Sequence, residues 1–204
     1  MERQVSSTKG GPTALFPAII CYGLLATFFL VEGALRRGAA AKSLDATMSD
    51  RGTTRTIGIA FLSCLVSVMI APVLSRLGIG RFGSPTIAWT GLGGMVLGMS
   101  LRVWANQTLG TSYTRTLKTM QGQSIVSNGP YRVLRHPGYG GVLLMWLGAG
   151  VALRNWVALG FVALLLGLAY RRRMNAEEEM LLTNFGVAYR DYCRRTWRII
   201  PFLY

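Results

Sequence analysis

The chain has 204 residues, of which 51% are hydrophobic, with a mean hydropathy of +0.37 and a net charge of +14. This composition is too apolar for an ordinary soluble domain. The apolar residues cluster in runs of roughly 20 residues, which is the length that a helix needs to cross a bilayer core. The basic residues flank these runs, which favours membrane topology and anionic lipid over nucleic acid as the reason for the charge. No nucleic-acid recognition module is visible. We therefore predict an all-α integral membrane protein.

Residues 1–108 are predicted to form three transmembrane helices, Ala14–Leu35, Ile57–Leu77 and Thr86–Ala105. Glu32 is expected at the membrane interface near the end of the first helix. The third helix contains the small-residue pattern Gly94-x-x-x-Gly98, which allows two helices to approach closely. We expect it to serve packing within the chain rather than a dimer seam.

Residues 109–204 are predicted to form the cofactor-binding and catalytic region. Leu109–Asn128 is polar and contains short segments of high β-propensity. It is predicted to form a small extended segment outside the helices, such as a hairpin. Gly129–Gly141 follows; it is rich in turn residues and holds the only histidine, His136. Irregular polar backbone at a membrane boundary is tolerated where it is buried in protein or lines a cavity, so we expect this stretch to line a pocket.

Two shorter apolar runs come next, Val142–Leu153 and Trp156–Tyr170. Each would give about 18 to 22 Å of helix, which is short for a core of about 30 Å. They form either a helical hairpin that dips in and returns or two spans lengthened by neighbouring residues, and the second interpretation gives about five transmembrane helices. An amphipathic helix over Arg171–Phe185, ended by Gly186, and a basic helix over Val187–Trp197 complete the prediction.

The basic residues predict the orientation. The last two apolar helices can return the chain to the side that holds the first loop, residues 36–56. In that case the lysines and arginines left on the other side are only Arg3, Lys9, Arg76, Arg81 and Arg154. The positive-inside rule then places the N-terminus outside, and the central stretch and the C-terminal region in the cytoplasm.

Two polar motifs are candidates for chemistry. On a helix, Tyr170, Arg173 and Glu177 share one face, whereas Glu178 lies about 100° away, so at most one or two glutamates point into the same pocket. The alternative is a solvated charged helix, and His136 could simply cap a backbone carbonyl. Together the motifs predict a polar pocket that joins a water-soluble cofactor to a lipophilic substrate. No metal site is expected, because the chain has no Cys-x-x-Cys pair and a single histidine.

The pattern Gly129-Pro-Tyr-Arg-x-x-Arg-His-Pro-x-Tyr-x-Gly141, followed by Glu-Glu and by Phe185-Gly-x-x-Tyr-x-x-Tyr192, resembles the isoprenylcysteine carboxyl methyltransferase family. The resemblance covers roughly Leu109 to Tyr204. It implies methyl transfer from S-adenosylmethionine without a Rossmann domain. It assigns Arg173 to the contact with the substrate carboxylate. Arg171 and Arg172 are adjacent, and a one-residue shift of the match would give this role to one of them. The cofactor-binding residues that it implies are Gln123, Ser124, Ile125, Val126, Tyr131, His136, Tyr139 and Glu177.

This division of work is physically reasonable. A carboxylate acceptor is already ionised at neutral pH and needs alignment rather than a base, and Arg173 can provide a bidentate contact. A thiol or amine acceptor would need a base, for which His136 and Glu178 are the candidates.

Three functions are compared. The first is a membrane methyltransferase acting on a lipophilic acceptor, such as a prenylated cysteine carboxylate or a phospholipid amine. The second is an NADPH-dependent sterol-type reductase, whose family carries a similar Arg-His-Pro-x-Tyr-x-Gly stretch, and for which Arg171–Arg173 could bind a 2′-phosphate. The third is a non-catalytic membrane scaffold, which would bind no cofactor.

Overall fold

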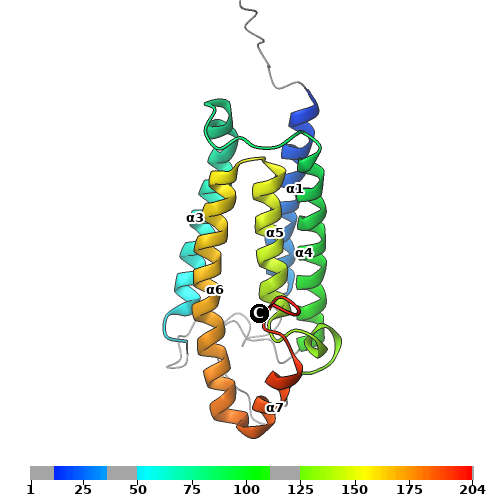
Figure 1. The fold of residues 1–204 in the computed structure, drawn as a ribbon, viewed down its shortest axis with the longest axis vertical. Helices are drawn as coiled ribbons and strands as arrows, with labels where there is room; N and C mark the ends of the chain where they lie inside the picture. Colours follow the sequence, from blue (N-terminus) through cyan, green and yellow to red (C-terminus); the bar gives the residue numbers. More distant parts are fainter. Residues whose placement is uncertain (1–11, 36–49, 111–124, 204) are drawn as a thin grey trace, which may run out of the picture.

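Five long helices run side by side in the computed structural model, and the C-terminal part of the chain folds back at one end of them (Figure 1). The structure describes residues 12–35, 50–110 and 125–203. Within these residues there is no strand, and the helices are α1 (Pro12–Leu35), α3 (Thr53–Arg76), α4 (Ile87–Leu109), the 3-10 helix η2 (Gly129–Arg132), α5 (Pro137–Ala152), α6 (Trp156–Phe185) and α7 (Val187–Arg195). The predicted all-α fold is therefore confirmed.

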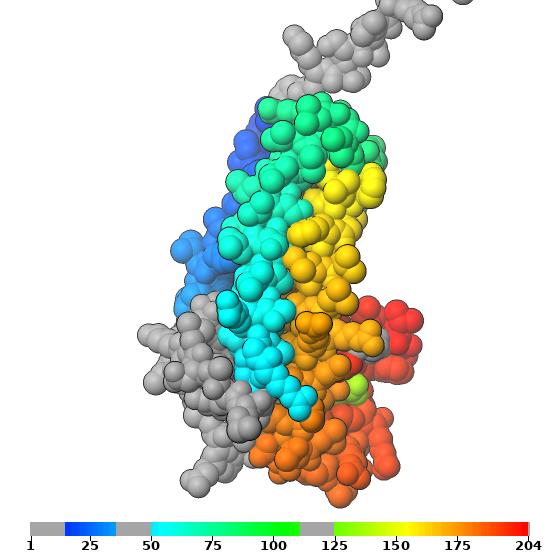
Figure 2. Space-filling view, turned by 90° about the vertical axis from the view of Figure 1, so that its left-hand side faces the viewer, coloured from blue at the N-terminus to red at the C-terminus, as the bar shows by residue number. Residues whose placement is uncertain are grey.

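Two helices are long and apolar enough to cross a membrane, Leu15–Leu35 of α1 and Thr53–Arg76 of α3, and α5 is a shorter apolar helix. Only 17% and 22% of the most apolar windows of the first two are buried. A core helix of a soluble protein would be mostly buried, whereas here many apolar side chains face outward. On the face shown in Figure 2, α3 lies alongside α6. Outward-facing examples on four helices are Ile19, Leu30, Leu62, Leu97 and Leu164. The described helices thus have the surface expected in lipid, and two of the five long helices have the length and hydropathy of a membrane span.

The boundaries of α5 and α6 differ from the prediction. We expected a helix to begin at Val142, but α5 begins five residues earlier, at Pro137. Proline is favourable in the first turn of a helix, because its missing N–H would have no partner there. The run Trp156–Tyr170 and the amphipathic segment form one continuous helix of 30 residues, and Gly186 ends it with a φ of 53°. At 1.5 Å per residue α6 is about 45 Å long, so it extends well beyond the apolar part of the bundle.

Glycine lets α4 and α5 pack with their backbones in contact. A Cβ on Gly98 would lie 2.5 Å from the carbonyl oxygen of Gly141, and one on Gly148 would lie 2.6 Å from that of Gly91. Gly94, which the small-residue pattern singled out, is peripheral, since its nearest backbone neighbour would be 3.8 Å away. The expected packing within the chain is confirmed, but Gly91 and Gly98, seven residues apart, carry it.

The opposite end of the bundle from α7 is closed by Asn155. Its side chain is fully buried and caps α6 by accepting a 3.0 Å hydrogen bond from the Ala158 amide. Its amide nitrogen donates to the carbonyl oxygen of Ile79, at 2.9 Å, and to the hydroxyl of Ser75, at 3.0 Å. These bonds join the segment after α3 to the turn between α5 and α6.

Candidate functional site

Backbone hydrogen bonds join the residues that follow α7 to the stretch Gly129–Gly141. The amide of Arg135 donates to Trp197 O at 2.7 Å, and the amide of His136 donates to Arg198 O at 3.0 Å. The amide of Trp197 donates in return to Val133 O at 2.8 Å. This pairing fixes the residues just before α5 against the chain that follows α7.

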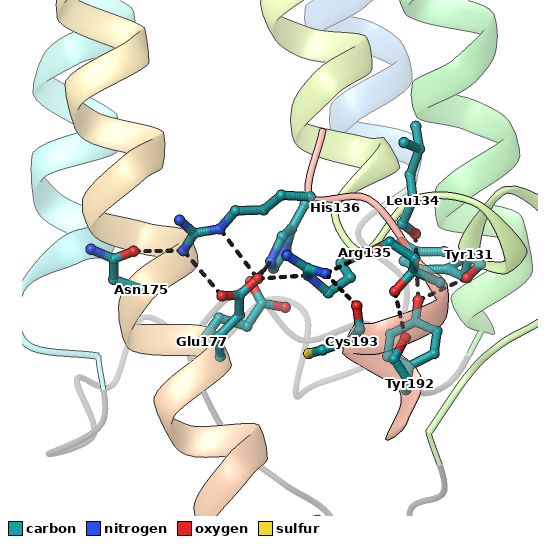
Figure 3. A network of polar contacts seen from close by, with 11 residues as sticks. Tyr131, Leu134, Arg135, His136, Asn175, Glu177, Tyr192 and Cys193 are labelled. Atoms are coloured by element: carbon teal, nitrogen blue, oxygen red, sulfur yellow. Dashed lines mark hydrogen bonds and ion pairs between the residues drawn. The ribbon is translucent and has the colours of Figure 1, made fainter. Parts of the chain in front are cut away.

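His136 stands immediately before α5, and its ring is directed at the acidic part of α6 (Figure 3). His136 is 4% exposed. Its Nε2 lies 3.0 Å from Oε1 of Glu178, and its Nδ1 lies 3.8 Å from Oε2 of Glu177. The side chain therefore contacts carboxylates instead of capping a backbone carbonyl.

Glu178 is the centre of an ionic cluster. Besides His136, it accepts from Nε of Arg135 at 3.1 Å and from Nε of Arg198 at 3.2 Å. Burial acts to raise the pKa of the Glu178 carboxyl, but the hydrogen bond from His136 and the charges of Arg198 and Arg135 outweigh it and lower the pKa below its ordinary value. A carboxylate held in this way joins α6 to the central stretch and is a poor general base.

Glu177, the neighbour of Glu178, contacts a second aromatic residue of the site, Tyr139. The hydroxyl of Tyr139 donates a 2.8 Å hydrogen bond to its Oε2. Tyr139 stacks on His136, with ring centroids 5.5 Å apart, and on Tyr170, at 4.8 Å. The Glu177 side chain is 27% exposed, and within the described part of the chain its Oε1 accepts no hydrogen bond. Two of the three consecutive glutamates thus point into one site, while Glu179 lies outside it.

Arg173 is buried next to Tyr139 and has an acidic partner that the sequence did not reveal. Its Nε donates to the Tyr139 hydroxyl at 3.3 Å, and its Nη1 contacts the Asp50 carboxylate and the Thr53 hydroxyl, the latter at 2.8 Å. Arg173 is 3% exposed and Asp50 1%. Burial acts to raise the pKa of Asp50, but hydrogen bonds from Thr54 and the charge of Arg173 lower it overall.

Asp50 was missed because its partner lies 123 residues away. A local signal was present in Asp50-Arg-Gly-Thr-Thr54, since an aspartate shortly before a helix commonly accepts hydrogen bonds from its first turn. Here the Thr54 amide donates to Oδ2 at 3.2 Å and the Thr54 hydroxyl to Oδ1 at 2.7 Å.

The remaining predicted cofactor residues are only partly brought together. Tyr131 is buried in η2, where burial raises the pKa of its phenol; the charge of Glu177 raises this pKa further, and the charge of Arg102 lowers it. Ile125 instead lines a surface hollow beside α7, with Tyr192 and Arg195. Val126 is half-buried. Gln123 and Ser124 lie outside the described residues.

A cavity of about 220 Å³ opens beside Tyr139 and Arg173. All five long helices contribute to it, and its lining combines aromatic side chains with two arginines. The lining residues are Phe28, Phe29, Glu32, Thr54, Ile57, Gly58, Phe61, Arg102, Tyr139, Val142, Tyr170 and Arg173. Such a mixture suits a molecule with a long apolar part and an anionic end.

Arg102 and Glu32 form an ion pair in the wall of the cavity. Nε of Arg102 is 3.1 Å from Oε2 of Glu32, and Nη2 is 2.7 Å from Oε1. Their side chains are 11% and 14% exposed. Glu32 was expected at the membrane interface near the end of the first helix, and in the structure its side chain lies in the wall of the cavity. Nothing in the local sequence pairs these two residues.

The site fits the groups of S-adenosylmethionine by its chemistry. Glu177 offers an acceptor for ammonium or hydroxyl donors, and the stacked aromatic rings offer apolar faces beside it. Among the described residues, no group of three or more histidine, cysteine, aspartate or glutamate side chains is arranged to hold a metal ion.

Comparisons with known proteins agree with this description. Residues 89–183 match the model of the isoprenylcysteine carboxyl methyltransferase (ICMT) family, so the similarity begins in α4, earlier than the motifs indicated. The chain is 29% identical over 119 residues to a probable protein-S-isoprenylcysteine O-methyltransferase of Oryza sativa subsp. indica, which covers 57% of this chain and 62% of the rice protein. It is 27% identical over 169 residues to protein-S-isoprenylcysteine O-methyltransferase B of Arabidopsis thaliana, covering 81% and 82% of the two chains. The chain thus spans about three fifths of the rice relative.

The fold has a solved counterpart. The structure of the eukaryotic intramembrane Ras methyltransferase ICMT superposes with a TM-score of 0.67, covering 92% of this chain and 68% of that one at 23% identity. A likeness at this identity concerns the fold. Residues 89–183 are thus similar in sequence to the isoprenylcysteine carboxyl methyltransferase family, and most of the chain shares the fold of the solved ICMT structure.

Proposed function

We propose that the protein is a membrane methyltransferase that transfers a methyl group from S-adenosylmethionine to the carboxylate of a lipophilic acceptor, a prenylated cysteine. The observation that carries the proposal is the position of Tyr139, whose hydroxyl contacts Glu177 on one side and Arg173 on the other, at the edge of an aromatic cavity. The related proteins described above are all methyltransferases. They give the reductase alternative no support.

In this proposal the two sides of Tyr139 have different tasks. Glu177 binds the polar groups of the methyl donor, together with His136, whose ring lies 3.8 Å from it, and with Tyr131. Arg173, held by Asp50, aligns the acceptor carboxylate in the cavity. The aromatic residues Phe28 and Phe61 contact the apolar tail. Tyr139 thus fixes the distance between the two half-sites.

The reaction needs no general base from the chain. S-adenosylmethionine supplies a methyl group on a cationic sulfonium; as the carboxylate oxygen forms its bond to that methyl, the bond from sulfur breaks and leaves a methyl ester and a neutral thioether. The acceptor is ionised at neutral pH, so His136 and Glu178 need not take up a proton. Charge is lost in the transition state, which a buried site of low dielectric favours over water.

We further propose that α1, α3, α4, α5 and α6 all cross the membrane, with the N-terminus outside and the site at the cytoplasmic end. Exposed apolar residues on these helices and the concentration of arginine near η2, the lower part of α6 and α7 support this orientation. Cysteine labelling of single-cysteine variants at position 79, in the turn after α3, and position 190, on α7, tests it. Labelling of both from the same side would contradict it.

Two binding measurements test the proposed activity. Calorimetric titration of the detergent-solubilised protein with S-adenosylhomocysteine is expected to show saturable binding, and titration with NADPH is expected to show none. Binding of NADPH alone would favour the reductase, and binding of neither would favour the scaffold.

An acceptor assay follows. Methyl transfer to an N-acetylated S-prenyl cysteine should give a product that releases methanol in base, as an ester does. Transfer instead to phosphatidylethanolamine, giving a base-stable product, would contradict the carboxylate acceptor.

A further inference from the structure

A hollow of about 370 Å³ lies on the bundle between α5, α6 and the segment that follows α7. Tyr170 and Met174 in its wall are buried, whereas Arg171 is exposed. Arg171 is also the one charged side chain among the described residues that line the hollow. These lining residues are Leu143, Gly167, Tyr170, Arg171, Met174 and Ile199. Apolar walls with one cation suit a molecule that has a hydrocarbon chain and an anionic group.

The hollow lies where the apolar part of α6 ends. Arg171 directly follows the apolar run Trp156–Tyr170. Gly167 lies one turn before Arg171 on the same face of the helix, about 6 Å along its axis. Leu164 and Leu168, which are 65% and 53% exposed, continue this face toward the start of α6. The hollow is therefore continuous with the apolar outer surface of the bundle, and its charge stands at the edge of that surface.

The guanidinium of Arg171 is available to a ligand. Among the described residues no carboxylate forms an ion pair with it. The acidic residues further along α6 have other partners, since Glu178 contacts Arg135 and Glu179 contacts Arg51. An anion that approached Arg171 would not have to displace either of these carboxylates.

We propose that the hollow binds one anionic phospholipid of the surrounding leaflet, with an acyl chain along Leu143 and Gly167 and the phosphate at Arg171. A guanidinium matches the oxygens of a phosphate with two parallel hydrogen bonds. Anionic lipid is favoured over zwitterionic lipid, because a choline group would bring a second positive charge close to Arg171 and the exposed Arg172. The proposal does not depend on the proposed methyl transfer.

The bound lipid would also contact the segment that follows α7. Ile199 packs on the first turn of α5, since a Cβ on Gly140 would lie 3.2 Å from its Cγ2. The carbonyl oxygen of the preceding residue, Arg198, accepts the hydrogen bond from the His136 amide. A lipid against Ile199 would thus add apolar contacts to the segment that pairs with the residues before α5.

The charge of the site is tested by native mass spectrometry of the full chain in detergent, titrated with phosphatidylglycerol or with phosphatidylcholine of the same acyl chains. The wild type should bind the first lipid more tightly. Arg171→Gln should weaken phosphatidylglycerol binding about 5-fold, the usual effect of one arginine near an anionic lipid surface. Phosphatidylcholine binding should change less than twofold. Arg172→Gln is the matched control, because Arg172 is exposed but does not line the hollow.

The apolar part is tested by filling the hollow. Nothing lies within 4 Å of a Cβ built on Gly167, so Gly167→Leu can place its side chain there without displacing protein atoms. Binding of phosphatidylglycerol should weaken by about 10-fold or more, since two methylene groups kept out of the hollow account for such a factor. Gly160→Leu is the control, because Gly160 is equally open and lies seven residues earlier on the same face, outside the hollow. Thermal unfolding without added lipid shows whether each variant is folded, and Arg171→Gln, at an exposed position, keeps the test valid if Gly167→Leu is not.

Three results would overturn the proposal. Equal losses in Arg171→Gln and Arg172→Gln would show a diffuse attraction to charge with no site at the hollow. Unchanged phosphatidylglycerol binding in folded Gly167→Leu would show that the acyl chain lies elsewhere. Binding of glycerol phosphate as tightly as of the intact lipid would show that a free phosphate is the ligand and that the hollow contributes nothing.

Discussion

The hydroxyl of Tyr139 donates a 2.8 Å hydrogen bond to Oε2 of Glu177 while its ring stacks between His136 and Tyr170. The same oxygen accepts from Arg173. One phenol thus connects the residue that we assign to the methyl donor with the residue that we assign to the acceptor.

Tyr139→Phe removes this connection and keeps the stacked ring. A hydrogen bond to a charged group is worth about 1.5–3 kcal/mol. The affinities for S-adenosylhomocysteine and for the acceptor should therefore both fall, and the two losses multiplied together should be about 10-fold or more. Calorimetry on the purified variant measures both. Tyr22→Phe is the matched control, because that hydroxyl only donates to the backbone of Val68 at 3.2 Å. Unaltered affinities in Tyr139→Phe would show that the phenol has no role in binding.

Glu177→Gln should weaken S-adenosylhomocysteine binding at least about 10-fold, because a charge-assisted contact to the ligand's amine or hydroxyl donors is replaced by a neutral one. The protein should stay folded, since the side chain is partly exposed. Glu179→Gln is the control, because Glu179 lies two residues further along, on a nearly opposite face of α6, and pairs with Arg51 at the surface. Equal affinities for the two variants would remove Glu177 from the cofactor site.

Arg173→Lys keeps the charge but removes the planar fork that suits a carboxylate. We expect the KM of the prenylated acceptor to rise about 10-fold or more, consistent with the loss of one charge-assisted hydrogen bond. S-adenosylhomocysteine affinity should fall much less. The reverse pattern, with cofactor binding lost and acceptor KM retained, would reassign Arg173 to the donor side.

Asp50→Asn removes the carboxylate that contacts the buried Nη1 of Arg173 and should lower the free energy of unfolding by about 3–5 kcal/mol, the usual cost of breaking a buried ion pair. The folded-state pKa of Asp50 is lowered, so its contribution is present above the unfolded pKa and is lost as the pH falls through the folded value. The stability advantage of the wild type over Asp50→Asn should therefore be constant from about pH 6 to 8 and shrink below about pH 4. Thermal unfolding in detergent across this range measures it, and an advantage that persists at low pH would contradict the pairing.

Gly98→Ala should destabilise the bundle by about 1–3 kcal/mol, the usual cost of overpacking, because the new methyl group would meet the backbone of Gly141 and Met145. Gly93→Ala is the control on the same helix, since nothing lies within 4 Å of its Cβ position. That change should be neutral or stabilising by about 0.5–1 kcal/mol. Similar melting temperatures for the two variants would argue against the glycine seam.

The sequence predicted the parts of the fold and site that depend on local pattern. Hydropathy located the described helices, Gly186 marked the end of α6, and helical spacing placed Tyr170, Arg173 and Glu177 on one face, where the structure joins Arg173 and Glu177 through Tyr139. The start of α5 was placed five residues late, because a proline and three glycines within residues 137–141 were read as turn residues, although proline suits a first turn and glycine allows close packing.

The parts that could not be predicted are contacts between distant segments. Asp50 meets Arg173, and Glu32 meets Arg102, across 123 and 70 residues. Charge and spacing along one helix carry no information about which other helix lies opposite. The predicted extended excursion lies mostly outside the described residues, and the roles assigned to the site residues stay predictions.

The glycine seam between α4 and α5 also decides where the cavity can adapt. Because the two backbones touch at Gly98 and Gly141, the wall that carries Arg102 and Tyr139 cannot widen without breaking that contact. Phe28 and Phe61, on α1 and α3, line the cavity from helices that are not part of this glycine seam. Acceptors with tails of different length would therefore be accommodated on the side of these aromatic residues, while the reacting end keeps a constant geometry against the rigid helix pair.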